Sequence, residues 1–114
     1  MAAVYVTNLV INSGADFSQS FTLEGTGNNS AIDLTGFDVS AEIRKWSGSS
    51  TSVSFGSTIV NPPTSGKIYL TLSSTDTLSL KPGRYVYDIV VSDLFGIKTR
   101  VIEGMVLVRE GVTR

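Results

Sequence analysis

Carboxylates are the side chains of this sequence best suited to acid–base chemistry, because its 114 residues include ten Asp and Glu but no histidine or cysteine. Ser/His/Asp and Cys/His nucleophilic sites, HExxH zinc sites and imidazole general bases are therefore excluded within this sequence. Two carboxylates about 5 to 10 Å apart in a cleft could still hydrolyse a glycoside. Nothing in the sequence nominates such a pair, and no phosphate-binding glycine motif occurs. We therefore expect no enzyme activity, no cofactor and no metal.

Five carboxylates have a predicted structural role. Asp33, Asp38 and Asp93 stand at or beside turns, where an aspartate side chain commonly accepts hydrogen bonds from nearby backbone amides. Asp88 and Glu103 interrupt apolar segments, and a carboxylate that faced inward there would need a cationic partner. The candidate partners are Arg44, Arg84 and Arg100.

Three aromatic residues do not fit the predicted core and are candidates for binding. Trp46 breaks the alternation beside a Ser-rich segment, Tyr69 points away from its apolar neighbours, and Phe95 lies in a loop. Trp and Tyr are well suited to anchor an interface. A carbohydrate-binding module is one alternative, and it would require all three rings on one exposed platform. The residues that we predict to contact a partner are Trp46, Phe55, Tyr69, Leu94, Phe95, Val112 and Arg114.

Short segments of alternating apolar and polar residues must position these side chains. The alternation has the period of a β-strand with one buried face, and turn-forming residues separate the segments. The predicted strands are residues 4–12, 17–24, 37–46, 53–60, 67–74, 84–93 and 97–109. About seven strands without a long amphipathic helix predict an all-β fold, which we take to be an immunoglobulin-like antiparallel β-sandwich. We expect one domain over residues 1–114.

Local signals refine this prediction. Pro62 has no backbone N–H to donate, so the strand before it should lie at a sheet edge. Residues 74–80 could form one helical turn, capped by Ser74 or Thr75. Tyr85 follows a Pro-Gly corner, where a tyrosine corner of immunoglobulin-like sandwiches would sit. The small polar residues 25–31 predict an exposed loop.

The overall charge argues against two classes of partner. Only 17% of residues are charged, and nine basic against ten acidic residues give a net charge of −1. No global field would attract nucleic acid or an anionic membrane. We also find neither a signal peptide nor an apolar stretch long enough for a membrane span.

Six short motifs run through most of the sequence: DFSQSFTL (16–23), IDLTGF (32–37), AEIR (41–44), GKI (66–68), LTL (70–72) and PGRYVYD (82–88). In this order they resemble small β-sandwich virion proteins of tailed bacteriophages, above all the amino-terminal domain of phage baseplate upper proteins. The resemblance implies a non-enzymatic virion protein, made in the host cytoplasm, that docks on other phage structural proteins or self-associates. The long carboxy-terminal receptor-binding region of that family has no counterpart here, so a head decoration protein is the alternative placement.

Overall fold

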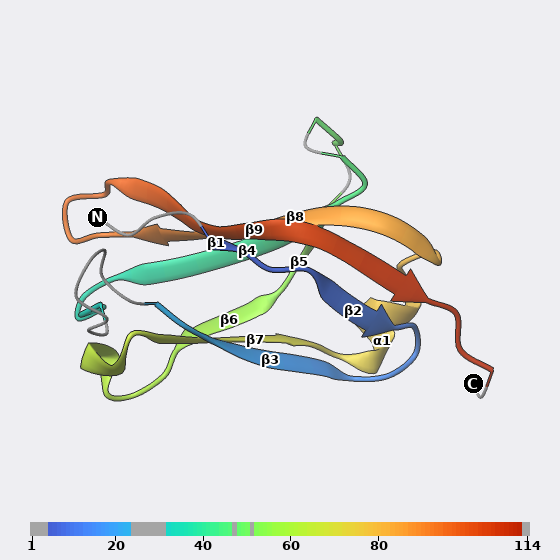
Figure 1. Ribbon diagram of the computed structural model, residues 1–114, viewed down its shortest axis with the longest axis horizontal. Helices are drawn as coiled ribbons and strands as arrows, with labels where there is room; N and C mark the ends of the chain where they lie inside the picture. The colour runs from blue at the N-terminus through green and yellow to red at the C-terminus, as the bar shows by residue number, and fades with distance from the viewer. Residues whose placement is uncertain (1–4, 24–31, 47, 51, 113–114) are drawn as a thin grey trace.

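The computed structural model describes residues 5–23, 32–46, 48–50 and 52–112. They form two β-sheets that pack face to face (Figure 1). The larger sheet has the order β1 (Tyr5–Val6) and β2 (Leu9–Asn12), then β9 (Lys98–Arg109), β8 (Gly83–Ser92), β4 (Asp38–Arg44) and β5 (Ser52–Ser54). The smaller sheet has the order β3 (Phe17–Thr22), β7 (Lys67–Leu72) and β6 (Gly56–Ile59). Two short helices, η1 (Pro63–Ser65) and α1 (Ser74–Leu78), flank β7.

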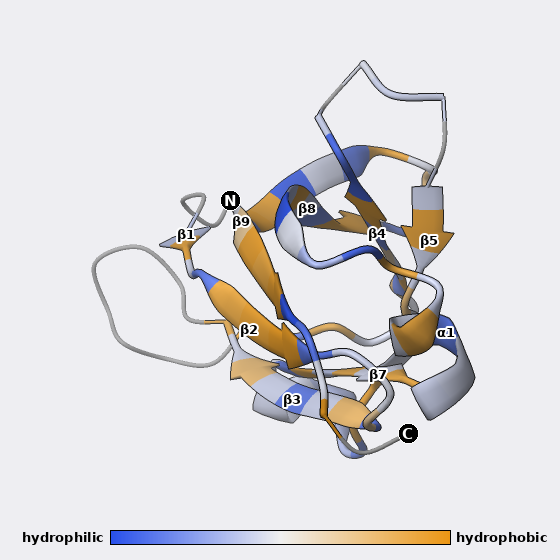
Figure 2. Cartoon of the chain, turned by 90° about the vertical axis from the view of Figure 1, so that its right-hand side faces the viewer, coloured by the Kyte–Doolittle hydropathy of each residue, from blue (hydrophilic) through white to orange (hydrophobic). Residues whose placement is uncertain are grey.

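The core lies between the two sheets and is mainly aliphatic, as the alternation predicted. Figure 2 shows hydrophobic stretches along strands of both layers. Ile43, Ile68, Leu70 and Ile89 are at most 1% exposed, and each comes from the apolar phase of its strand; Val106 of β9 is buried with them. Because these residues alternate with exposed or half-buried ones, the two inner faces together exclude water. The predicted all-β sandwich is confirmed.

The pairing of the first strands corrects the prediction of a purely antiparallel sandwich. Both β1 and β2 pair in parallel with β9, with Tyr5 opposite Ile102 and Leu9 opposite Val106. The period-2 pattern encodes which side chains face inward but carries no information on strand direction. The wrong part of the prediction is therefore the direction in which these two strands pair with the sheet.

Between β1 and β2 the chain passes very close to β9. A Cβ atom on Gly104 would lie 2.1 Å from the Thr7 carbonyl oxygen, so only glycine fits there without a shift. The same oxygen accepts a 2.6 Å hydrogen bond from the buried Tyr87 hydroxyl, and the Asn8 side-chain oxygen accepts one from the Met105 amide. The Tyr87 and Asn8 side chains thus supply hydrogen bonds at the interruption between β1 and β2.

The predicted strand 53–60 is in fact divided between the two sheets. β5 pairs with β4 in the larger sheet, and β6 pairs with β7 in the smaller one. Phe55, the residue between them, is only 5% exposed, because its ring turns inward at the crossing and packs near Phe17 and Tyr87 with centroids 6.0 and 6.1 Å away. The prediction that Phe55 contacts a partner is therefore wrong. As Pro62 indicated, β6 lies at a sheet edge.

Two local features complete the fold. Ser73 caps α1, since its hydroxyl accepts a 3.2 Å hydrogen bond from the Asp76 amide, so the predicted caps Ser74 and Thr75 lie one and two residues too late. The Tyr85 hydroxyl donates a 2.7 Å hydrogen bond to the Lys81 carbonyl, which confirms the tyrosine corner. The predicted loop 25–31 lies outside the described residues. Within the described part of the chain, no helix is long and apolar enough to cross a membrane.

Candidate functional site

The turn between β8 and β9 presents three apolar side chains to solvent. We call residues 93–97 the hairpin tip; it lies at the left end of the molecule in Figure 1. Leu94, Phe95 and Ile97 are 75%, 87% and 58% exposed. Single exposed apolar residues are common, but three within four positions at the end of one hairpin form a concentrated apolar surface.

The hairpin tip is ordered by Asp93. Its side-chain oxygen accepts hydrogen bonds from the Phe95 and Ile97 amides at 2.8 and 3.0 Å, and its carbonyl accepts one from Gly96 at 3.0 Å. The left-handed φ of 81° at Gly96 allows this tight turn. Leu94 also lies against Gly36, where a Cβ atom would come within 2.6 Å of its side chain. The exposed side chains of Leu94, Phe95 and Ile97 thus project from an ordered backbone turn.

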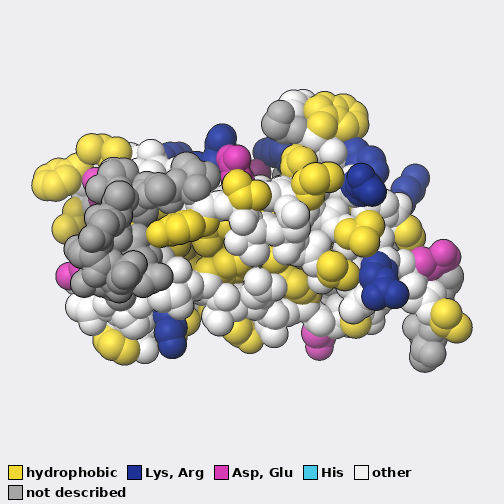
Figure 3. Space-filling model, in the orientation of Figure 1, with side chains coloured by type: hydrophobic (Ala, Val, Ile, Leu, Met, Phe, Trp, Pro, Cys, Tyr) yellow, Lys and Arg dark blue, Asp and Glu magenta, His cyan; other side chains and the backbone are white. Residues whose placement is uncertain are grey.

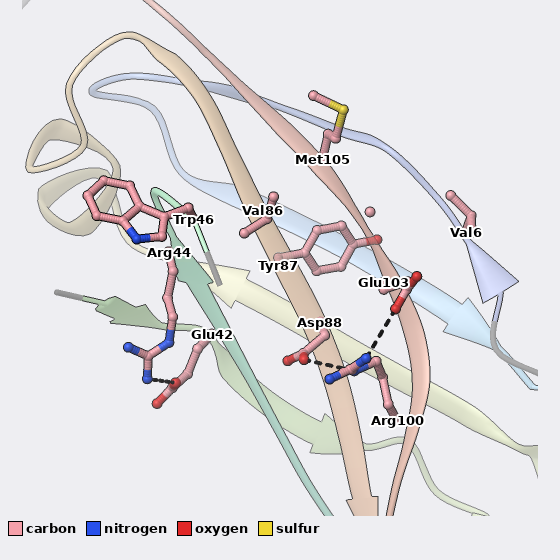
Figure 4. Close-up of a pocket in the computed structure, with 11 residues that line it drawn as sticks. Val6, Glu42, Arg44, Trp46, Val86, Tyr87, Asp88, Arg100, Glu103 and Met105 are labelled. Carbon is pink, nitrogen blue, oxygen red and sulfur yellow. Dashed lines mark hydrogen bonds and ion pairs between the residues drawn. The ribbon is translucent and has the colours of Figure 1, made fainter. Parts of the chain in front are cut away.

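A second feature is a groove of about 610 Å³ on the outer face of the larger sheet. We call it the sheet groove; Figure 4 shows its lining. Val6, Trp46, Val86 and Met105 make one side of it apolar. Val86 and Met105 are directly opposite each other on β8 and β9, so their contact across the strands is set by the register.

Beside this apolar side runs a row of three carboxylates. The register places Glu42 opposite Asp88 and Asp88 opposite Glu103. Arg44 pairs with Glu42 at 2.8 Å, and Arg100 bridges Asp88 and Glu103 at 3.1 and 3.4 Å (Figure 4). Three carboxylates minus two guanidinium groups leave one uncompensated negative charge in the groove.

The ion pairs settle the predicted role of Asp88 and Glu103. Arg100 is their common partner, as one of the three candidates, but the side chains lie on the outer face of the sheet and are 37–56% exposed. Pairs at this exposure contribute about 0 to 1 kcal/mol to stability. The carboxylates therefore shape the charge of the surface more than they stabilise the fold.

Two of the three predicted turn aspartates, Asp33 and Asp93, accept local hydrogen bonds as expected, whereas Asp38 is the first residue of β4. Asp93 orders the hairpin tip, and Asp33 accepts hydrogen bonds from the hydroxyl and the amide of Thr35. These two bonds, the hydroxyl first, lower the pKa of Asp33 from its ordinary value. Among the described residues, no group of three or more His, Cys, Asp or Glu is arranged to hold a metal ion.

The aromatic residues proposed as a carbohydrate platform do not come together. Trp46 follows the Arg44 end of β4, whereas Phe95 follows Ser92, which pairs with Asp38 at the opposite end of β4. Six residues of strand separate these ends by about 20 Å. Tyr69 is exposed on β7, in the other sheet. The coplanar platform predicted for a carbohydrate-binding module is therefore absent among these three residues.

The predicted contact residues do not form one surface. Leu94 and Phe95 share the hairpin tip, and Trp46 borders the sheet groove. Val112 is 98% exposed after the end of β9, and Arg114 lies outside the described residues. Sequence reasoning missed Val6, Met105 and Ile97 as surface candidates. Only the strand register reveals that Val6 and Met105 border one groove. Ile97 begins the predicted strand 97–109, directly after the loop that contains Phe95, and could have been added from its position.

Comparisons with known proteins bear on the fold. No family model and no curated protein matches the chain. A solved structure of the SrpA adhesin from Streptococcus sanguinis is similar with a TM-score of 0.54 and 10% identity, over 96% of this chain and 56% of that one. An internalin-like protein of Listeria monocytogenes gives 0.45 and 15%, over 95% and 28%. The chain thus spans little more than half of the adhesin structure, and the likeness identifies it as a β-sandwich domain without indicating a ligand.

Proposed function

We propose that this chain is a non-enzymatic structural protein of a tailed-bacteriophage particle, a docking module associated with the tail or baseplate. The placement in a virion rests on the six sequence motifs described above. The docking role rests on the hairpin tip, where Leu94, Phe95 and Ile97 are exposed on an ordered turn. Other structural proteins of the particle, made in the same host cytoplasm, are its proposed partners.

The energetics of the hairpin tip favour insertion into a pocket. Full burial of a Leu, Ile or Phe side chain contributes about 1.5 to 3 kcal/mol. The Phe95, Gly96 and Ile97 amides already have acceptors within the turn, so desolvation would leave none of these three unsatisfied. Since the turn is ordered before binding, little conformational entropy is lost on docking. These properties are those of an anchor for a protein partner.

The carboxylates support a binding role over hydrolysis. Asp88 and Glu103 share Arg100 on an open sheet face. A glycosidase needs one carboxyl group with a raised pKa in a cleft that holds the sugar, with the second carboxyl across the scissile bond. Here the Arg100 guanidinium contacts both carboxyl groups and so lies between them, where the scissile bond would have to be.

Particle composition tests the proposal. The gene would be replaced in its phage by variants that encode Phe95→Ser or, as a matched control, Leu78→Ser, which removes another exposed apolar side chain on α1, far from the tip (Figure 1). We expect mass spectrometry of purified particles to detect the wild-type chain and the control in equal amounts, and Phe95→Ser at least tenfold less. Circular dichroism of the purified variants would establish that both fold.

Two results would overturn the proposal. The chain could be absent from purified particles, which would remove the virion placement, or Phe95→Ser could be incorporated like the wild type, which would remove the docking role of the tip. A density map of the particle would then distinguish a tail location from head decoration.

A further inference from the structure

We infer that the partner that receives the hairpin tip is a second copy of this chain, which takes it up in the sheet groove. This inference rests on the proposed docking function and names the partner. It comes from the match between two surfaces of the same molecule, one projecting and apolar, the other hollowed and apolar on one side.

The apolar parts of the two surfaces correspond. Phe95 and Leu94 project from the tip, and Val6, Trp46 and Met105 are exposed around the groove. A volume of about 610 Å³ lies within the range of pockets that bury an entire small ligand, so it can accept one or two large side chains. Figure 3 shows hydrophobic side chains exposed on both parts of the molecule, at its left end and along its upper side.

The charges correspond as well. Lys98 is exposed directly after the hairpin tip, and among the described residues no ion pair involves it. In the groove, Glu42, Asp88 and Glu103 carry one negative charge more than their two arginines neutralise. On both surfaces the charge adjoins the apolar part. A lysine beside the carboxylate row would therefore complete the charge balance while the apolar side chains are buried.

The contact has to join two molecules. On β8 the tip begins after Ser92, whereas the groove is lined by Asp88 and the residues before it. The four residues of strand from Ser92 to Asp88 span about 13 Å. The hairpin continues outward from the sheet, so its tip cannot fold back onto the same face (Figure 1). Because the tip and the groove are different patches, a single contact leaves one tip and one groove free, so repetition produces a ring or an open row of copies, and a reciprocal exchange about a two-fold axis produces a closed dimer.

A contact formed by one hairpin tip is small. Stable protein interfaces usually bury about 1,200 to 2,000 Å² in total, which a few residues do not reach. We therefore expect a dissociation constant of about 0.1 to 1 mM in solution. In a particle, where copies are held close together, avidity raises the effective strength of such contacts without any new bond.

Complementation between two variants tests the inference. Phe95→Ser removes the tip but keeps the groove, and Met105→Arg keeps the tip but occupies the apolar side of the groove and neutralises its excess charge. In sedimentation experiments near 1 mM, we expect the wild type and the control Leu78→Ser to associate into dimers or larger assemblies. Each tip or groove variant alone should associate at least tenfold more weakly. Their equimolar mixture should form a dimer and nothing larger, since one intact tip and one intact groove remain.

The outcomes separate this inference from the proposed function. A wild type that stays monomeric at 1 mM, or variants that do not complement, would overturn self-association. If Phe95→Ser were nevertheless lost from particles, another virion protein would be the partner and the docking function would stand. Normal incorporation of Phe95→Ser, in contrast, would overturn the docking function itself.

Discussion

The middle of the β8–β9 hairpin and its tip contain the same kinds of residue in opposite surroundings. In the middle, the Tyr87 ring is buried beside Phe55, and its hydroxyl bonds to the Thr7 carbonyl. At the tip, Phe95 is largely exposed although Asp93 fixes the backbone beneath it. Hydrogen bonds order both regions, but only the ring in the middle of the hairpin is covered by other side chains of the protein. Order and burial are therefore separate properties here, and an ordered, uncovered aromatic ring is what the proposed docking role requires.

Truncation of Phe55, which packs against the middle of the hairpin, and of Phe95 at its tip should give the largest contrast. Phe55→Ala removes a ring that is 5% exposed and leaves a cavity between the sheets, so we expect the free energy of unfolding to fall by about 3 to 5 kcal/mol. Phe95→Ala removes an exposed ring and should change it by less than about 0.5 kcal/mol. Urea denaturation followed by circular dichroism measures both. Equal losses would mean that the tip is packed in solution and would remove the contrast.

High pH should destabilise the middle of the hairpin through Tyr87. Burial raises the pKa of this phenol to about 12, whereas an unfolded tyrosine ionises near pH 10. Between these values the unfolded state binds fewer protons than the folded state, so stability falls as the pH rises from 10 to 12, by a loss on the order of 2 kcal/mol.

Substitution isolates this contribution. In Tyr87→Phe the additional fall between pH 10 and 12 should disappear, although stability at pH 7 should already be lower by about 1 to 3 kcal/mol because the Thr7 carbonyl loses its donor. Tyr69→Phe, at an exposed site, should behave like the wild type. Urea denaturation across this pH range checks both, and an identical pH dependence in Tyr87→Phe would contradict the assignment.

Removal of the Asp93 side chain should disorder the tip with little effect on global stability. Asp93→Ala removes the acceptor of the Phe95 and Ile97 amides, so we expect these amides to exchange with solvent at least tenfold faster. Because the turn is exposed, global stability should fall by about 1 kcal/mol or less. Hydrogen exchange measured by NMR detects the change. Asp33→Ala is the matched control, since it removes a similar turn bond at Thr35 and should leave the tip unchanged.

The alternating pattern was sufficient to predict most buried positions. Phe21, Ile43, Leu70 and Ile89 lie inward as their phase indicated. In the sequence of β9, the charged residues Lys98 and Arg100 share a phase with Ile102, Val106 and Val108, so alternation alone does not show which face is buried. In the structure, a register irregularity between Ile89 and Val90 of β8 shifts the pairing with β9. As a result Val101 and Ile102 are both buried although they are consecutive. A local bulge depends on the partner strand and leaves no signal in the alternation.

The candidate site was predicted only where a local signal existed. Leu94 and Phe95 stood in a loop, which was enough to place them at the surface. Phe55 was misplaced because its segment reads as one strand, whereas it crosses from one sheet to the other. The sheet groove combines Val6 from the first strand with Met105 from the last. Such a surface follows from strand order, which the sequence pattern does not contain.

The parallel pairing of β1 and β2 with β9 also has a consequence for synthesis. Leu9 and Ile11 leave the ribosome early, but β9, against which they pair, is made about 90 residues later. Until then the edge of the larger sheet stays open and these side chains have no cover from that strand, so the last steps of folding follow translation of β9. A chain that ends before β9 would therefore expose apolar surface and aggregate, and it would not form a smaller stable domain.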